Sequence, residues 1–480
     1  MTSFIESWLQ ECDISSTSLE NPYFTSARSL LTVSKPTNVT LGTGHSVISS
    51  ICDTILSTCK HELILVTCFW AKSTSLDSLA RLLLALSAKA LAQGSKIRVR
   101  LCFSSLSLLQ KLFHTQSPAG RTWQPQEWAS KLGLPPPEQL RGLDLNVKSI
   151  FMLPISVMHP KLMIIDRKSV FLPSCNVSWE PWFEGAVKLK GPVVEKCFLR
   201  FFEGFWCQGD EDNPQNVEGS SAGDRDPEAG DVSIEALRHG TQSSHGRPLA
   251  TSTSGTLPAQ FSFPSAGEVP TLFLPSQYHR NPQFRLPWQP AANPPMTPLN
   301  SFLLHLFALA TSSIFLQTPN ITSPPVLAAV VSALERGVSV TIVTNERLML
   351  VEQLVTAGTT TTSCVSKLVS SHRRLCSQCH EPQELYQRQY GRPHGRLHIS
   401  YFSSRPGQGE QKDLHPVSSH LKMTVVDDEL LVLGSGNMDR ASWYTSQELG
   451  VAFASQEMAS VMLDQVKKVD SQYCKVFYDG

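Results

Sequence analysis

Two short stretches of the chain repeat the same three polar residue types at the same spacing. They are His159, Lys161 and Asp166 in HPKLMIID and, about 260 residues later, His420, Lys422 and Asp427 in HLKMTVVD. On an extended backbone side chains alternate, so the His and Lys of each stretch share a face and can address one ligand. Each Asp has the opposite parity at the end of an apolar run. We group it with the candidate catalytic residues but expect it to brace a turn or a neighbouring backbone.

A hydroxyl, an amide and a carboxylate follow each stretch in a similar order. They are Ser174, Asn176 and Glu184 after the first stretch, and Ser435, Asn437 and Glu448 after the second. Pro173 stands where the second copy has Gly434, and Glu184 follows its Asn by eight residues whereas Glu448 follows by eleven. We therefore expect the loop of the first copy to have a different shape, and Glu180 competes with Glu184 as its carboxylate.

This set of groups suits attack on phosphorus. One imidazole can act as the nucleophile while the other protonates the leaving oxygen, which explains a need for two histidines. The lysines supply positive charge to the non-bridging oxygens, and Ser and Asn can donate hydrogen bonds to them. A carboxylate on the far ring nitrogen would fix the tautomer of a histidine. This chemistry requires neither a metal nor another cofactor.

The composition is that of a globular protein without a strong overall field. The 480 residues include 41 basic and 41 acidic side chains and are 41% hydrophobic, so any polyanion must be bound locally. The cysteines are scattered and several lie in apolar runs, which is typical of a reducing compartment. The N-terminus has no signal-peptide pattern, and no window is long enough for a membrane span. We expect a cytoplasmic protein with peripheral membrane contact, and a mitochondrial association stays open.

The elements that must position these groups read as two copies of one α/β unit. Helical and strand patterns alternate over about residues 38–103, and a similar alternation returns over residues 299–345. Amphipathic closing segments follow each motif, at 193–207 and 458–477. We predict an N-terminal segment at 1–44, a first domain at 45–207, a linker at 208–268 and a second domain at 269–480.

Two segments are predicted to lie outside these units. Residues 208–268 are rich in Gly, Ser, Pro and charge, so we expect a disordered linker. The polar segment 370–396 reads as a surface insertion in the second domain. It contains Cys376, Cys379 and His380, but no second ligand pair accompanies them, and we do not assign a metal site.

The paired H-x-K-x4-D motifs, each followed by S-x-N, resemble the signature of the phospholipase D superfamily. The resemblance covers about residues 45–207 and 269–480, and GSGNMDRASWYTSQELGVAF looks most like the cardiolipin-synthase-like branch. It implies two α-β-α sandwich domains related by a pseudo-twofold axis, a phosphohistidine intermediate on His159 with His420 as acid and base, and a phospholipid substrate. The lysines, serines and asparagines of both copies would hold the phosphate. Because both motifs are in one chain, a monomer would suffice.

Two other functions are weighed against the lipid enzyme. A nuclease would use the same chemistry, and basic stretches such as HRR at 372–374 offer contacts, but the neutral net charge argues against broad binding of nucleic acid. An inactive phospholipid-binding scaffold is the third hypothesis. Decay usually removes a His or Lys, and both pairs are intact. The aromatic segments at 178–183 and 442–444 either contact acyl chains or pack in the interior.

Overall fold

The computed structural model describes residues 2–14, 19–20, 24, 26–107, 117–152, 156–208, 257–263, 267–281, 292–378, 394–403 and 415–480. The first half comprises α1 (Thr2–Ile14), a 3-10 turn (Arg28–Leu30), β1 (Leu31–Thr43), α2 (Gly44–Thr58), β2 (Glu62–Phe69), α3 (Thr74–Ala92), β3 (Ile97–Ser105), β4 (Arg121–Thr122), α5 (Pro125–Glu127), a π-helical turn (Trp128–Leu132), a 3-10 turn (Pro137–Gln139), β5 (Leu143–Ser149), β6 (Phe151–Met152), β7 (Ser156–Val157), β8 (Leu162–Ile165), β9 (Ser169–Pro173), β10 (Trp182–Lys190), a π-helical segment (Val194–Leu199), α6 (Arg200–Trp206) and β11 (Ala259–Ser262).

The second half repeats this sequence of elements with some additions. It comprises β12 (Val269–Ser276), α9 (Pro298–Leu309), β13 (Ser313–Gln317), α10 (Pro324–Glu335), β14 (Ser339–Thr344), α11 (Leu350–Ala357), α12 (Thr361–Gln378), β15 (Leu397–Phe402), β16 (Ser418–Ser419), β17 (Met423–Val426), β18 (Leu430–Gly434), α14 (Arg440–Tyr444), β19 (Glu448–Ala454), α15 (Gln456–Tyr473) and β20 (Cys474–Asp479).

The strands of the two halves follow the same order. In the first half the order is β5-β3-β2-β8-β9-β10-β1, and in the second it is β15-β14-β13-β17-β18-β19-β12. In each half the first three strands of this order are parallel to one another. The two strands that follow the motif histidine form an antiparallel hairpin, and this hairpin pairs antiparallel with the strand on either side. The predicted α/β class and the duplication of the unit are therefore confirmed, whereas a pseudo-twofold axis stays a prediction.

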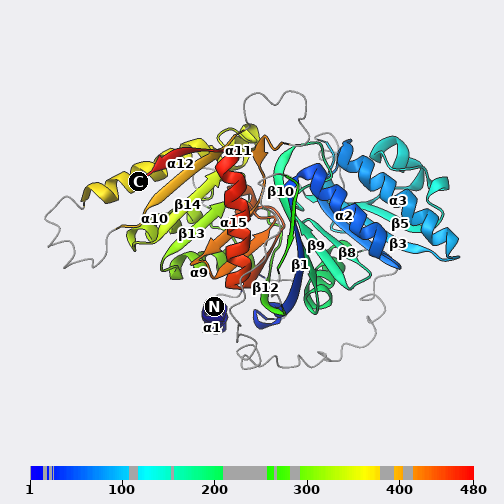
Figure 1. Cartoon of the computed structure of the whole chain (residues 1–480), viewed down its shortest axis with the longest axis horizontal. Coiled ribbons are helices and arrows are strands. Elements are labelled where there is room, and N and C mark those ends of the chain that lie inside the picture. Colours follow the sequence, from blue (N-terminus) through cyan, green and yellow to red (C-terminus); the bar gives the residue numbers. More distant parts are fainter. Residues whose placement is uncertain are drawn as a thin grey trace.

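The two halves form two lobes along the long axis of the molecule (Figure 1). Helices α2 and α3 lie on one lobe, helices α9, α10 and α12 on the other, and β1, β10, β12 and α15 lie between them. One apolar core runs from the second half into this central region, and another lies between α2, α3 and the first sheet. Because both faces of β2 are covered, its sequence is a nearly continuous apolar run.

Strand β1 joins the two sheets. Residues 31–34 pair with β12, and residues 35–43 pair with β10, with a shift of register between Pro36 and Asn38. Proline has no N–H for the ladder, so an irregular register next to Pro36 is expected. The structure differs here from the sequence interpretation, which treated residues 1–44 only as an N-terminal segment. Helix α1 also packs on the second half, where Trp8 contacts Phe302 of α9.

The segments predicted to be irregular are described only in part. Most of the 208–268 linker lies outside the described residues, but β11 at its end pairs with β1. Residues 370–378 do not belong to a surface insertion, because they complete helix α12, which carries the buried Val365, Leu368 and His372 at helical spacing. The polar composition of residues 370–378 obscured the helical spacing of these buried side chains. Residues 379–393, with Cys379 and His380, lie outside the described residues.

Candidate active site

His159 takes its orientation from the second half of the chain. The backbone of Gln447 exchanges hydrogen bonds with the segment before the motif, because His159 N donates to Gln447 O at 3.0 Å and Gln447 N donates to Val157 O at 2.9 Å. The next residue, Glu448, then lies with its carboxylate oxygens 2.8 and 3.0 Å from His159 Nδ1. A carboxylate can only accept, so Nδ1 carries the proton and Nε2 keeps a lone pair.

His420 takes its orientation from the first half in the same way. Strand β16 pairs in parallel with the start of β10, and His420 N donates to Phe183 O at 2.9 Å. The following residue, Glu184, places Oε1 at 2.7 Å from His420 Nδ1. Glu184, and not its competitor Glu180, is therefore the carboxylate that contacts a histidine. Each half supplies the carboxylate for the histidine of the other.

The two serines hold these carboxylates in place. Ser174 donates to Glu184 Oε2 at 2.5 Å, and Ser435 donates to Glu448 Oε2 at 2.5 Å. Each hydroxyl oxygen also accepts a backbone N–H, from Gly185 at 2.9 Å and from Leu449 at 3.0 Å. In this structure the serines orient the two glutamates, which is a different contact from the phosphate contact that the resemblance implied.

The two lysines lie in the same buried cluster. Lys161 donates to His159 O at 2.9 Å, and Lys422 donates to His420 O at 2.6 Å. Lys422 Nζ is also 2.8 Å from His420 Nδ1. Since Nδ1 cannot donate to Glu184 and accept from Lys422 at once, the shorter contact to the charged carboxylate decides the tautomer. The structure thus brings both His/Lys pairs together at one centre.

The charges in this centre balance with the imidazoles neutral. Burial lowers the pKa of His159, and it lowers the pKa of His420 to about 3, although the glutamates oppose this. Burial by itself would raise the pKa values of Glu184 and Glu448, but their histidine and serine partners outweigh it and lower them. Burial also lowers the pKa of Lys422 to about 7. While Lys422 is protonated, two carboxylates face the two lysine side chains and the charges balance, and each Nε2 is available as a nucleophile or base.

The two asparagines lie in loops of different shape. Asn176 Oδ1 accepts the N–H of Phe69 at 3.2 Å, whereas Asn437 Nδ2 donates to Asp439 Oδ2 at 3.0 Å. The expected difference between the loops is confirmed, because the extra residues of the second copy form α14, whose N-cap is Asp439. Burial raises the pKa of Asp439. The sequence interpretation missed this residue, although an Asp three positions before Ser442 is a helix N-cap signal.

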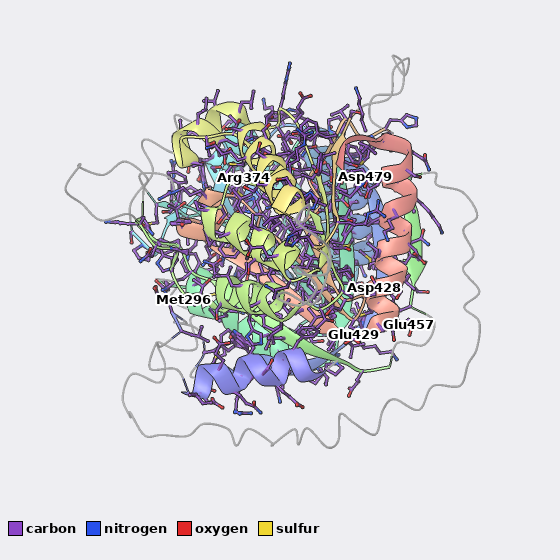
Figure 2. The ribbon with its side chains drawn as sticks, turned by 90° about the vertical axis from the view of Figure 1, so that its left-hand side faces the viewer. Met296, Arg374, Asp428, Glu429, Glu457 and Asp479 are labelled. Carbon is purple, nitrogen blue, oxygen red and sulfur yellow. The ribbon has the colours of Figure 1, made fainter. Side chains whose placement is uncertain are left out.

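The two aspartates of the motifs lie at the other end of their strands. Asp166 accepts the N–H groups of residues 60, 61 and 62, and Asp427 accepts those of residues 311, 312 and 313. Both have positive φ, at 49° and 53°, in the hairpin turns. Asp428 and Glu429, next in the second turn, lie close to Glu457 of α15 (Figure 2). The aspartates therefore fix turns and do not join the His/Lys cluster.

Aromatic residues occupy two different positions around the centre. Trp182 packs on the His420 ring, with ring centroids 4.8 Å apart, and Trp179 is 58% exposed beside Phe69. Trp443 and Tyr444 are buried, so the interpretation as interior packing holds for them.

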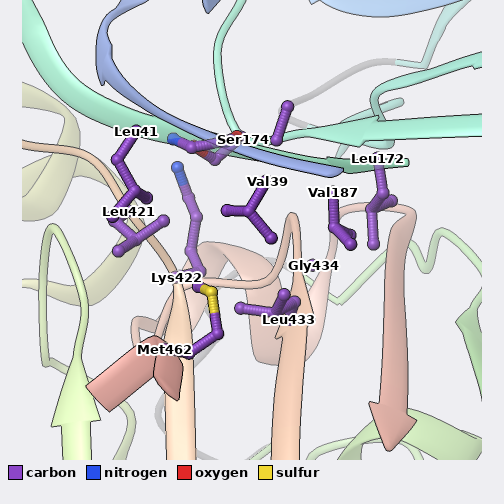
Figure 3. A pocket seen from close by; sticks show the side chains of 12 residues that line it. Val39, Leu41, Leu172, Ser174, Val187, Leu421, Lys422, Leu433, Gly434 and Met462 are labelled. Carbon is purple, nitrogen blue, oxygen red and sulfur yellow. The ribbon is translucent and has the colours of Figure 1, made fainter. Parts of the chain in front are cut away.

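The interface between the halves continues behind the centre as a small apolar cavity. Figure 3 shows Lys422 extending from the second half toward Ser174 of the first, with Val39 and Val187 on one side and Leu433 and Met462 on the other. Its volume of about 20 Å³ would hold little more than a water molecule. A substrate must therefore approach from another side.

Comparisons with known proteins agree with this architecture. Residues 303–469 match the family model described as "Cardiolipin synthase, PLD-like domain". The structure is similar to phosphatidylserine synthase from Haemophilus influenzae Rd KW20, with a TM-score of 0.50 and 14% identity over 92% of this chain and 89% of that chain. Together they show that the chain has a phospholipase D superfamily fold.

A second solved structure matches a smaller part of the chain. The phospholipase D family member Nuc from Salmonella typhimurium covers 37% of this chain and 90% of its own, with 18% identity and a TM-score of 0.26. A search of curated protein sequences finds no match.

Proposed function

We propose that the chain is a phospholipase D-type phosphodiesterase or phosphatidyltransferase that acts on phospholipid through a covalent phosphohistidine. The observation that carries this proposal is the reciprocal exchange of carboxylates, since each Nδ1 is held by an ionised glutamate of the other half. Two neutral imidazoles with free Nε2 atoms and two buried lysines then surround one centre. This arrangement supports in-line displacement at phosphorus.

In the first step, His159 Nε2 attacks the phosphorus atom and the bond to the leaving alcohol breaks. Binding of the anionic phosphodiester favours the imidazolium form of His420, which takes up a proton at Nε2 and donates it to that alcohol oxygen. The side chains of Lys161 and Lys422 stabilise the negative charge on the non-bridging oxygens. Glu448 stabilises the positive charge that forms on the imidazole of His159.

In the second step, the neutral His420 takes a proton from water or from an acceptor alcohol. The resulting oxygen nucleophile attacks phosphorus, and the bond between phosphorus and His159 Nε2 breaks. Water gives hydrolysis and an alcohol gives phosphatidyl transfer.

The choice of phospholipid is supported by the branch of the family that matches residues 303–469 and by apolar side chains near the centre. Helix α11 exposes Leu350, Val351, Leu354 and Val355. It contacts α14, which follows Asn437, because Arg440 donates to Thr356 O at 3.2 Å. Among the described residues, no helix is long and apolar enough to cross a membrane. We propose peripheral contact of this helix with a phospholipid surface at the cytoplasmic side, with the organelle left open.

The test is phosphodiester turnover by the wild type and by the His159→Ala and His420→Ala variants. Phosphatidylglycerol or phosphatidylcholine vesicles and single-stranded DNA are offered, with and without EDTA. We expect lipid turnover that falls by at least about 10³-fold in both variants and does not respond to the chelator. DNA cleavage alone would assign the chain to the nuclease class. No turnover of any of these substrates would favour the inactive scaffold.

A further inference from the structure

Ser419 is the residue directly before His420, and its N–H, its carbonyl oxygen and its hydroxyl each form a hydrogen bond. Asn345 Oδ1 accepts the N–H of Ser419 at 2.8 Å, and Asn345 Nδ2 donates to Ser419 O at 2.8 Å. Gln317 Nε2 donates to the hydroxyl of Ser419 at 3.0 Å. Asn345 therefore fixes the backbone next to the catalytic imidazole, and Gln317 holds the side chain of the same serine.

The hydrogen-bond chain continues from Gln317 to a buried carboxyl group. Gln317 Nε2 also donates to Asp470 Oδ1 at 3.2 Å, and Asp470 lies on α15 with 8% exposure. Cys474 Sγ lies 3.6 Å from the same oxygen. No cation contacts Asp470 among the residues that the structure describes. Its neighbours are Gln317 from β13 and Cys474 from β20.

Two acceptor atoms in this chain are buried without a hydrogen-bond partner. They are Asp470 Oδ2 and Gln317 Oε1. Leaving two buried acceptors of neighbouring side chains without donors is costly in free energy. A single proton on Asp470 Oδ2 would make this atom a donor to Gln317 Oε1. Burial raises the pKa of Asp470 to about 7, so this proton is present in weakly acidic solution and is lost above neutrality.

Among its described residues, the first half shows no such chain. Val66 occupies the position in the first half that Gln317 occupies in the second. Val66 pairs with Leu162 and Gln317 pairs with Met423, and each of these partners lies three positions after the motif histidine. Met158 precedes His159, and its N–H is held by Ser104 Oγ at 2.9 Å. The backbone clamp is thus common to both halves, whereas the part of the chain that the structure describes shows the link to a titratable group in the second half and not in the first.

We propose that Asp470 is a positioning residue for His420 that acts through Gln317 and Ser419 and does so only while it is protonated. The protonated carboxyl donates to Gln317 Oε1 and keeps the amide on the hydroxyl of Ser419. Ionisation places a negative charge between acceptors, draws Gln317 Nε2 toward the carboxylate and releases Ser419. A displacement of His420 of about 1 Å would be enough to cost roughly 10²-fold in rate.

The experiment compares wild type with Asp470→Asn, which is neutral at every pH and can donate to Gln317 Oε1. This prediction rests on the proposed function for its kinetic part. In the wild type, kcat should fall above neutral pH by up to about tenfold per unit more than in Asp470→Asn. Superimposable kcat profiles would overturn the proposal.

A second readout needs no substrate, so that it separates this inference from the proposed function. The imidazole resonances of His420 are assigned by their loss in His420→Asn. They should shift near neutrality in both proteins, because Lys422 lies 2.8 Å from His420 Nδ1 and titrates in that range, but the shift should be larger in the wild type than in Asp470→Asn. In Ser419→Ala, which keeps the Asn345 clamp, this excess should also vanish. His159 is the internal control. A shift of equal size in the wild type and in Asp470→Asn contradicts the proposal, whereas a wild type without phosphodiester turnover contradicts only the proposed function.

Discussion

Replacing Glu184 by Gln tests the exchange of carboxylates between the halves most directly. The variant keeps the shape of the side chain but removes the negative charge that lies 2.7 Å from His420 Nδ1. A charge-assisted hydrogen bond contributes about 1.5–3 kcal/mol, which corresponds to roughly 10- to 150-fold in rate. The amide can also present its NH₂ group to the ring and so favour the wrong tautomer.

A second consequence of this substitution falls on Lys422. Burial lowers the pKa of Lys422 to about 7, and Glu184 is the first group that opposes this. Without the carboxylate the pKa falls further, so Lys422 is neutral at pH 7 and loses its attraction for phosphate. The two effects together predict a fall in kcat/KM of about 10²–10⁴-fold.

The assay is steady-state turnover of phospholipid vesicles at several pH values. Glu180→Gln is the matched control, because Glu180 is a half-buried carboxyl four residues away whose side chain bonds to Ser178. We expect Glu448→Gln to resemble Glu184→Gln, and the double variant to lose less than the product of the single losses because both glutamates serve one reaction. If Glu180→Gln were as damaging as Glu184→Gln, or if Glu184→Gln were fully active, the assignment of the carboxylates would be refuted.

Three further predictions follow from the structure. Asp427→Ala should lower the free energy of unfolding by about 2–4 kcal/mol, because backbone and hydroxyl donors of residues 311–313 lose their acceptor. The kcat of the folded enzyme should change by less than about twofold. A selective loss of kcat in stability-matched conditions would instead give Asp427 a catalytic role. Because the pKa of Lys422 is lowered to about 7, its charge is lost as pH rises through neutrality, so KM for phospholipid should increase above pH 7, and a KM that is constant to about pH 9 would contradict this. Leu354→Asp on α11 should weaken binding to phospholipid vesicles in sedimentation by about tenfold, whereas Leu91→Asp, at an exposed leucine of α3, should not, and equal effects would show that α11 is not the contact.

The duplication and the meeting of the His/Lys pairs could be predicted from the sequence because both follow from the spacing of residues that are close together in the chain. Each motif has its own alternation of helices and strands, and two copies of such a unit share a buried interface. The partner of each histidine could not be predicted in this way. Glu184 and His420 are 236 positions apart, and their contact depends on the pairing of β10 with β16 across the interface.

Other differences have local causes. The role of β1 was missed because a strand that changes partner between Ser34 and Lys35 gives no single pattern for one sheet. The last turns of α12 were missed because Arg373 and Arg374 mask a helical stripe that includes the buried His372. Asp439 was missed because its importance comes from α14, an element of only five residues.

The surroundings of the two histidines divide their roles even though the motifs are alike. The side chain of His159 is 12% exposed, whereas that of His420 is 3% exposed and lies against Trp182. A nucleophile must reach the phosphorus atom itself, while an acid and base needs only to reach a proton on the leaving or entering oxygen. The more accessible imidazole therefore suits the covalent step. His420, fixed through Ser419, suits proton transfer, which demands an accurately placed Nε2 in both steps. Phosphate trapped on His159 in the His420→Ala variant would agree with this division, and phosphate trapped on His420 in the His159→Ala variant would reverse it.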